Sequence, residues 1–131
     1  MAVILVVEDD PNQCLLYAKE IRGAGYDVVT AHDGREALEL VEKARPDLVV
    51  MDVSMPGIDG IEAMSRMLAR DHKLPIILNT AYATYRESFR SWSADAYVVK
   101  SSDLTELKDT IRKVLESRSR LADQAGTGRA N

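Results

Sequence analysis

Residues 3–13 read VILVVEDDPNQ, and this stretch marks the change from strand to helix on which the chain is built. The apolar and mostly β-branched run Val3–Val7 predicts a buried strand. Asp10 follows as a helix N-cap, and Pro11 takes the first helical position, where its missing amide costs nothing. Gln13, three residues after Asp10, completes a capping box in which its side chain reaches back to the cap. The stretch therefore predicts a strand that leads directly into a helix.

The same change from strand pattern to helix pattern recurs along the chain. Four further strands are predicted at Asp27–Thr30, Leu48–Met51, Ile76–Asn79 and Ala96–Val99. Four further capping pairs are Asp33 with Glu36, Asp59 with Glu62, Thr84 with Glu87 and Asp103 with Glu106. Strands that alternate with helices of this length predict a parallel sheet that is covered on both faces. We therefore expect a doubly wound (βα)5 fold of the α/β class.

The length of 131 residues suits a single domain. The helical pattern of the last predicted helix, with Leu104, Leu107, Ile111 and Val114 on one face, ends before Ser117. The residues beyond are polar or small. We expect one folded domain over residues 1–118 and a disordered tail or linker stub over residues 119–131.

Composition argues against several classes of protein. The 17 basic and 21 acidic side chains give a net charge of −4, without the clustered Lys and Arg of a nucleic-acid surface. Cys14 is the single cysteine, so neither an internal disulfide nor a cysteine metal site can form. The apolar start is too short for a signal peptide or for a membrane span, which needs about 20 residues. We expect a cytoplasmic protein with no membrane and no direct nucleic-acid partner.

Polar side chains follow four of the five predicted strands. The first strand runs into Glu8 and Asp9, the third into Asp52, the fourth into Thr80 and the fifth into Lys100. Ligands bind open parallel sheets outside the carboxyl ends of the strands. If the second strand lies at an edge, as in sheets of order 2-1-3-4-5, all these side chains converge at one rim.

This set of side chains suits phosphoryl chemistry. Three carboxylates at one rim repel one another unless a cation neutralises them. Oxygen ligands without His or Cys favour a hard ion, and Mg²⁺ is the natural occupant. A lysine and a hydroxyl supply the positive charge and the hydrogen-bond donor that a transferred phosphoryl group needs. We therefore predict a magnesium-dependent phosphoryl site.

Four motifs in this order resemble the receiver domain of response regulators in bacterial two-component systems. They are VVEDDP at residues 6–11, PDLVVMDVSMPGIDG at residues 46–60, the pair Thr80-Ala81 and AYVVK at residues 96–100. The resemblance covers about residues 2–116. It implies a flavodoxin-like fold with a five-stranded parallel sheet of order 2-1-3-4-5.

The resemblance also implies roles for the acidic residues. Asp52 is expected to be the phospho-acceptor. Asp9 is expected to bind Mg²⁺ directly, while Glu8 acts mainly through water and the backbone carbonyl of Ser54 completes the protein ligands. The protein would then be a signalling domain that catalyses only its own phosphorylation and dephosphorylation, and not an enzyme with another substrate.

The resemblance further implies a switch and its partners. Thr80 is expected to hydrogen-bond the phosphoryl group, Lys100 to pair with it, and Tyr97 to change rotamer in response. The phosphoryl donor would be a sensor histidine kinase or a phosphotransfer protein. The signal would pass to a downstream protein through a surface made of the helix after Thr84, the strand Ala96–Val99 and the final helix.

Two of the departures from the family pattern concern the backbone. Ser101 follows Lys100 where a proline with a cis peptide bond is usual, so we expect a trans bond here. Ser93 stands where a glycine commonly ends a helix. Either this serine adopts a left-handed conformation or the helix ends differently. The helical spacing of four aromatic residues favours a core position over an exposed partner surface; they are Tyr82, Tyr85, Phe89 and Trp92.

Two other functions are compatible with acids after parallel strands. One is a magnesium-dependent enzyme of another class, such as a Toprim-like nuclease or a haloacid-dehalogenase-like phosphatase. Both expect an Asp-x-Asp pair, and Ser54 stands at the second position. The other is a degenerate receiver that binds partners without phosphorylation, against which the complete set Asp9, Asp52, Thr80 and Lys100 argues.

Overall fold

The computed structural model describes residues 1–52, 60–81 and 93–130, with side chains up to Arg120. Its elements in chain order are β1 Val3–Val7, α1 Pro11–Gly23, β2 Asp27–Ala31, α2 Gly34–Ala44, β3 Leu48–Met51, α3 Gly60–Arg70, β4 Ile76–Thr80, β5 Ala96–Val99 and α4 Thr105–Ala130. The five predicted strands are confirmed, and β2 and β4 each end one residue later than predicted. The helix predicted after Thr84 lies outside the described residues.

The strands form one parallel sheet of order β2-β1-β3-β4-β5. The register of β1 places Val7 beside Ala31 on β2 and beside Met51 on β3, so these three strands end at the same level. On the other side, Thr80 at the end of β4 pairs with Val99 at the end of β5. The fold is therefore the predicted doubly wound, flavodoxin-like α/β sheet.

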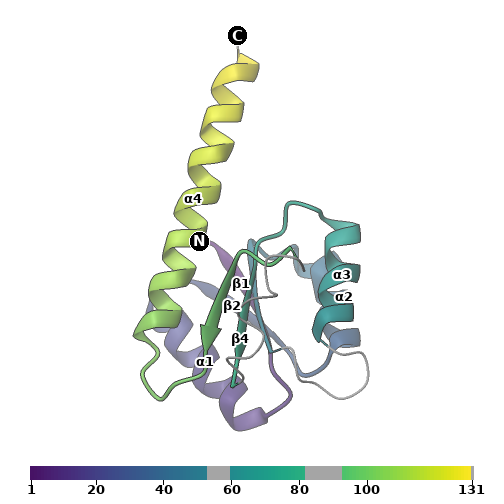
Figure 1. Ribbon diagram of the computed structural model, residues 1–131, viewed down its shortest axis with the longest axis vertical. Coiled ribbons are helices and arrows are strands. Elements are labelled where there is room, and N and C mark those ends of the chain that lie inside the picture. The colour runs from purple at the N-terminus through teal and green to yellow at the C-terminus, as the bar shows by residue number, and fades with distance from the viewer. Residues whose placement is uncertain (53–59, 82–92, 131) are drawn as a thin grey trace.

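Helices cover both faces of the sheet, with α1 and α4 on one side and α2 and α3 on the other (Figure 1). Alternate residues of each strand point to opposite faces, which gives two core layers. Leu5 and Val7 of β1 lie in the layer under α2 and α3, whereas Ile4 and Val6 lie in the layer under α1 and α4. The central strands are buried on both faces, which explains their continuous apolar sequence.

The predicted helix caps are present where the chain is described. Asp10 accepts hydrogen bonds from the backbone amides of Asn12 and Gln13, and Asp33 accepts one from that of Glu36. Asp103 accepts from the amide of Thr105, the first residue of α4. The caps predicted at Asp59 and Thr84 lie outside the described residues.

The last helix continues beyond the predicted domain. It passes residue 118 without interruption, ends at Ala130 and projects away from the sheet (Figure 1). Loss of the apolar pattern predicts where packing stops, but helical backbone hydrogen bonds can continue without packing. The boundary between domain and tail at residue 118 stays a prediction. No helix in the described part of the chain is long and apolar enough to span a membrane.

The structure shows the backbone conformation at Ser93 and Ser101, the two positions where the sequence analysis expected the backbone to depart from the family pattern. Ser93 has a φ of 67°, so it occupies the left-handed region that favours glycine. Of the two alternatives at this position, the left-handed serine is therefore the correct one. The peptide bond between Lys100 and Ser101 is trans, as predicted.

Candidate functional site

Backbone hydrogen bonds bring the predicted site residues to one rim of the sheet. The amide of Asp52 donates to the carbonyl of Val7 at 3.2 Å, and the amide of Lys100 donates to the carbonyl of Thr80 at 2.8 Å. Both bonds extend the parallel pairing one residue beyond the strand ends. The side chains that follow β1, β3 and β5 therefore leave the sheet at the same edge.

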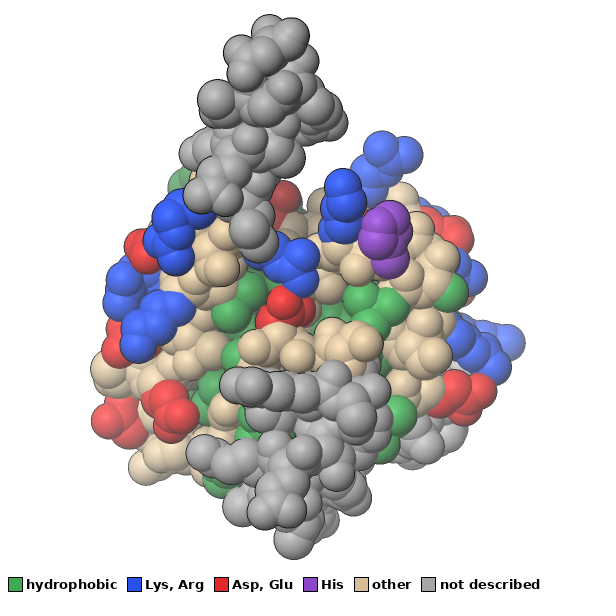
Figure 2. Space-filling model, turned by 45° about the horizontal axis from the view of Figure 1, so that its top comes forward, with side chains coloured by type: hydrophobic (Ala, Val, Ile, Leu, Met, Phe, Trp, Pro, Cys, Tyr) green, Lys and Arg blue, Asp and Glu red, His purple; other side chains and the backbone are tan. Residues whose placement is uncertain are grey.

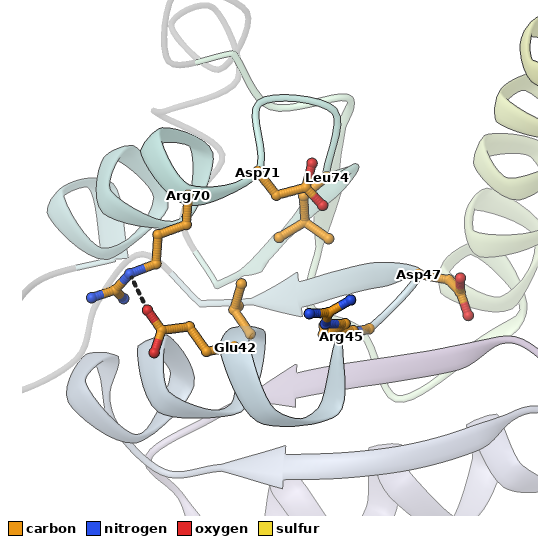
Figure 3. Close-up of a pocket in the computed structure, with 8 residues that line it drawn as sticks. Glu42, Arg45, Asp47, Arg70, Asp71 and Leu74 are labelled. Carbon is orange, nitrogen blue, oxygen red and sulfur yellow. Dashed lines mark ion pairs between the residues drawn. The ribbon is translucent and has the colours of Figure 1, made fainter.

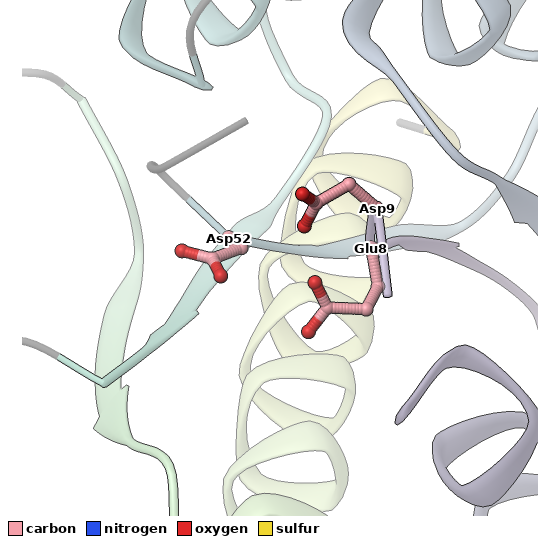
Figure 4. Close-up of side chains that lie close together, drawn as sticks. All are labelled: Glu8, Asp9 and Asp52. Carbon is pink, nitrogen blue, oxygen red and sulfur yellow. The ribbon is translucent and has the colours of Figure 1, made fainter. Parts of the chain in front are cut away.

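Three carboxylates form a cluster at this edge. Oxygen atoms of Glu8, Asp9 and Asp52 all lie within 4.8 Å of one another. Figure 4 shows Asp52 on the strand next to the one that carries Glu8 and Asp9. Glu8 is 2% exposed and Asp52 7% exposed, while Asp9 lies open to solvent. The cluster is thus buried on one side and accessible on the other.

The donor set of this cluster fits a hard divalent cation. Carboxylate oxygens are the ligands that Mg²⁺ prefers, and the cluster contains neither His nor Cys. Glu8 Oε2 is buried and accepts no hydrogen bond from the described part of the chain. A buried carboxylate oxygen without a donor carries a large desolvation cost, which a bound cation or its water would offset. Ser54, the remaining predicted ligand, lies outside the described residues.

Lys100 lies against the same carboxylates. Its Nζ donates to Asp52 Oδ2 at 2.8 Å and also to Glu8 Oε1. Burial by itself lowers the pKa of Lys100, but hydrogen bonds and charge attraction from Asp52 and Glu8 outweigh it and hold the pKa above its ordinary value. The ammonium therefore stays positively charged at neutral pH.

The pKa of Glu8 is shifted in the same direction for a different reason. Burial raises it, Lys100 opposes the shift, and the negative charge of Asp52 adds to it. The raised pKa means that the contact with Lys100 does not fully offset the cost of burying the Glu8 carboxylate.

Thr80 and Tyr97, the two residues predicted to form a switch, lie on the neighbouring strands β4 and β5. Thr80 ends β4, between β3 and β5, and is completely buried. Tyr97 on β5 is 8% exposed and belongs to the core layer under α2 and α3.

Cys14 is buried on α1, and burial raises the pKa of its thiol, which suits an inert core cysteine.

Three polar residues near the rim were not predicted as site residues. Gln13 Oε1 accepts a hydrogen bond from Lys100 Nζ at 2.8 Å. The capping pattern did not predict this contact, because it joins Gln13 to a lysine that lies 87 positions away in the sequence. Tyr17 and Asn79 are also buried, and Asn79 directly precedes Thr80. The sequence signal that could have indicated Asn79 was a polar residue inside an otherwise apolar strand.

A second hollow lies at the opposite end of the sheet. Its volume is about 660 Å³, and it is lined by Val41, Glu42, Arg45, Pro46, Asp47, Arg70, Asp71 and Leu74. These residues end α2 and α3 or precede β3 and β4. Figure 2 shows Lys and Arg side chains interspersed with Asp and Glu on the face turned toward the viewer. Arg70 pairs with Glu42 at 2.9 Å (Figure 3), so the charges largely compensate. The hollow contains none of the predicted site residues.

The family model of the response regulator receiver domain matches residues 4–112. Sporulation initiation phosphotransferase F of Bacillus subtilis is 34% identical over 118 residues, which are 88% of this chain and 95% of that protein. Regulatory protein AtoC of Escherichia coli, a much longer protein, is 37% identical over 119 residues, which are 88% of this chain. The chain spans only 26% of the length of AtoC.

Solved structures agree with these sequence relatives. The response regulator TrrA of Thermotoga maritima, crystallised with Mg²⁺ and BeF, has 43% identity and a TM-score of 0.82, over 86% of this chain and 98% of that one. TrrA in complex with the histidine kinase ThkA superposes with a TM-score of 0.81, over 88% of this chain and 99% of that one. Both similarities cover most of this chain and nearly all of the matched chain.

Proposed function

Because the chain belongs to the response regulator receiver domain family, we propose that it accepts a phosphoryl group on Asp52 in a magnesium-dependent reaction. The observation that carries this proposal is the convergence of Glu8, Asp9, Asp52 and Lys100 at one rim. A carboxylate oxygen of Asp52 attacks the phosphorus of the donor. A new P–O bond forms while the bond to the donor breaks, and the leaving group takes up the proton that it needs.

The surrounding residues prepare this reaction by their charge. Lys100 pairs with the phosphoryl oxygens and compensates negative charge as the phosphoryl group approaches. Glu8, Asp9 and Asp52 would hold Mg²⁺, which would supply positive charge against the negative charge that develops on the phosphoryl group. Asp9, which is open to solvent, would be the direct side-chain ligand. Glu8 would act mainly through water, and the carbonyl of Ser54 would complete the protein ligands.

We propose that the donor is a histidine kinase or a phosphotransfer protein that docks on α1. The described residues expose few large apolar side chains, and two of them are Leu15, at 70%, and Leu16, at 46%, on this helix. Leu16 and Leu104 also line a shallow groove of about 190 Å³ between α1 and the start of α4. The helix begins directly after the acidic turn, so a protein bound to it lies close to Asp52. The TrrA–ThkA complex shows that a relative binds a histidine kinase.

We propose that phosphorylation changes the surface that binds a downstream protein, and that the domain turns over no other substrate. A phosphoryl group on Asp52 adds roughly two negative charges and strong acceptor oxygens. Thr80 donates its hydroxyl to these oxygens, and the ring of Tyr97 fills the volume that Thr80 vacates. The surface on β5 and α4 then binds a downstream protein differently. A cytoplasmic location fits this signalling role and the single reduced cysteine.

Labelling with a small acyl phosphate tests the proposed function directly. Intact-mass measurement is expected to show one added phosphoryl group in the presence of Mg²⁺ and none after chelation. Labelling that is equally fast without a divalent cation would contradict the magnesium dependence. A release of inorganic phosphate from unrelated phosphomonoesters at an enzymatic rate would favour the alternative of a phosphatase.

A further inference from the structure

We propose that Gln13 is a positioning residue that holds the Lys100 ammonium at the rim throughout the phosphorylation cycle. This inference rests on the proposed function and adds a residue from α1 to those at the strand ends. Gln13 Oε1 accepts from Lys100 Nζ at 2.8 Å, between residues that lie 87 positions apart in the sequence. The contact joins the first turn of α1 to the end of β5.

The hydrogen-bond inventory of Lys100 explains why this contact matters. A lysine ammonium has three N–H donors. Their acceptors here are Glu8 Oε1, Asp52 Oδ2 and Gln13 Oε1. The two carboxylates also belong to the cluster that the proposed cation binds, so their oxygens change partners during the cycle. Gln13 stands outside that cluster, and its bond to Lys100 can persist.

The chemistry of an amide suits this task. Lysine is a compact charge on a flexible stem, so one further contact restricts where its ammonium lies. A neutral amide oxygen provides that contact without adding a fourth negative charge to the rim. A carboxylate at this position would compete with the phosphoryl group for Lys100 and would repel it. Gln13 therefore positions the Lys100 ammonium and leaves its positive charge available for the phosphoryl oxygens.

Gln13 is itself held from two sides. Its backbone amide donates to the N-cap Asp10 at 3.4 Å. One helical turn later, the hydroxyl of Tyr17 donates at 3.5 Å to Gln13 Oε1, the atom that also accepts from Lys100. Tyr17 is 5% exposed. A buried residue on α1 thus supports the side chain that contacts Lys100.

The variant Gln13→Met tests the role in catalysis. Methionine keeps the size and the helix propensity of glutamine but removes the acceptor. The rate of Asp52 labelling by a small acyl phosphate with Mg²⁺ is expected to fall about fivefold, the factor for one hydrogen bond of ordinary net strength. The matched control is Asn12→Met, which places the same side chain at the preceding, exposed position of α1 and is expected to label at the parent rate.

A double-mutant cycle separates positioning from a purely structural role. If Gln13 acts through Lys100, Gln13→Met causes no further loss once Lys100→Met is present. An equal loss in both backgrounds would show that Gln13 stabilises α1 and does not position the lysine, and the proposal would be overturned.

The hydrogen bond can also be measured without any phosphorylation. In ¹H–¹⁵N spectra of lysine ammonium groups, the Lys100 signal is identified by its loss in Lys100→Met. We expect this signal to exchange faster with solvent in Gln13→Met than in the parent or in Asn12→Met. An unchanged signal would overturn the inference even if Asp52 is phosphorylated. Absence of labelling in the parent would contradict the proposed function alone.

Discussion

Lys100 Nζ lies 2.8 Å from Asp52 Oδ2, although their strands, β5 and β3, are separated in the sheet by β4. The long lysine side chain spans the end of β4, where Thr80 is completely buried. A phosphoryl group on Asp52 would therefore meet a cation and a hydroxyl on neighbouring strands. This relationship connects the chemistry at Asp52 to the strand that carries Tyr97.

In Thr80→Ala, phosphorylation of Asp52 is expected to change the signalling surface less than it does in the parent. Without the hydroxyl, the phosphoryl group loses the donor that moves Thr80, while Asp52 keeps Lys100 as its partner. Trp92 is the single tryptophan of the chain and a convenient probe, although it lies outside the described residues. Its fluorescence is expected to change on phosphorylation of the parent and to change less in Thr80→Ala. The coupling involved is of the order of 1–3 kcal/mol.

Thr80→Ser is the control for this experiment, because it keeps the hydroxyl and removes only a methyl group. It is expected to respond like the parent. Intact-mass measurement must show that all three proteins carry the label. A full fluorescence response in labelled Thr80→Ala would mean that the hydroxyl does not transmit the signal.

Magnesium affinity is expected to distinguish the two acids after β1. Asp9 is open to solvent, whereas Glu8 is buried and already accepts a hydrogen bond from Lys100. Asp9→Asn removes the proposed direct ligand and should weaken Mg²⁺ binding by clearly more than Glu8→Gln, for which roughly tenfold is typical of an indirect contact. Calorimetric titration measures both. Asp10→Asn, which keeps a good N-cap, should bind as the parent does. The reverse ranking of Asp9 and Glu8 would overturn their assigned roles.

Docking of the donor protein on α1 predicts a difference between two phosphoryl sources. Leu15→Glu places a charge on the exposed apolar part of α1 and should slow transfer from a phosphohistidine protein that labels the parent. Labelling by a small acyl phosphate should not change, because that donor needs no docking surface. Ser65→Glu, at an exposed position of α3 on the other face of the sheet, serves as the control. Equal effects on both phosphoryl sources would place the defect in the site and not in docking.

Two left-handed positions predict opposite effects on stability. Ser93 has a φ of 67° and Gly25 a φ of 103°. Ser93→Gly relieves backbone strain and should raise the free energy of unfolding by up to about 1 kcal/mol, after the larger unfolded-state entropy of glycine is included. Gly25→Ala should lower it by about 1 kcal/mol through backbone strain, since an added Cβ meets no other atom within 4 Å. Urea unfolding measures both, and a destabilised Ser93→Gly would contradict this account of the turn.

Local sequence patterns predicted the elements of this fold because strand and helix periodicity act over a few residues. The runs at Val3–Val7 and Leu48–Met51 are buried strands, as their apolar sequence indicated. The pairing of β1 with both β2 and β3 was not derivable from spacing, because it depends on contacts between distant segments. The strand order came from the family resemblance.

The site was predictable where function depends on what ends a strand, as for Asp52 and Lys100. Gln13 was missed because the same residue type three positions after Asp10 also satisfies a capping box. Which partner the side chain contacts is decided by Lys100, far away in the sequence. The ligand roles of Glu8, Asp9 and Ser54 and the switch roles of Thr80 and Tyr97 stay predictions.

The central claim is that Asp52 is the residue that accepts the phosphoryl group, and mapping of the labelled carboxylate tests it most directly. Borohydride reduces an acyl phosphate on an aspartate to homoserine, which peptide mass spectrometry locates. We expect homoserine at position 52 alone in protein labelled with a small acyl phosphate and Mg²⁺, and none in Asp52→Asn. Homoserine at Asp9 or at another aspartate of the parent, with Asp52 intact, would contradict the account.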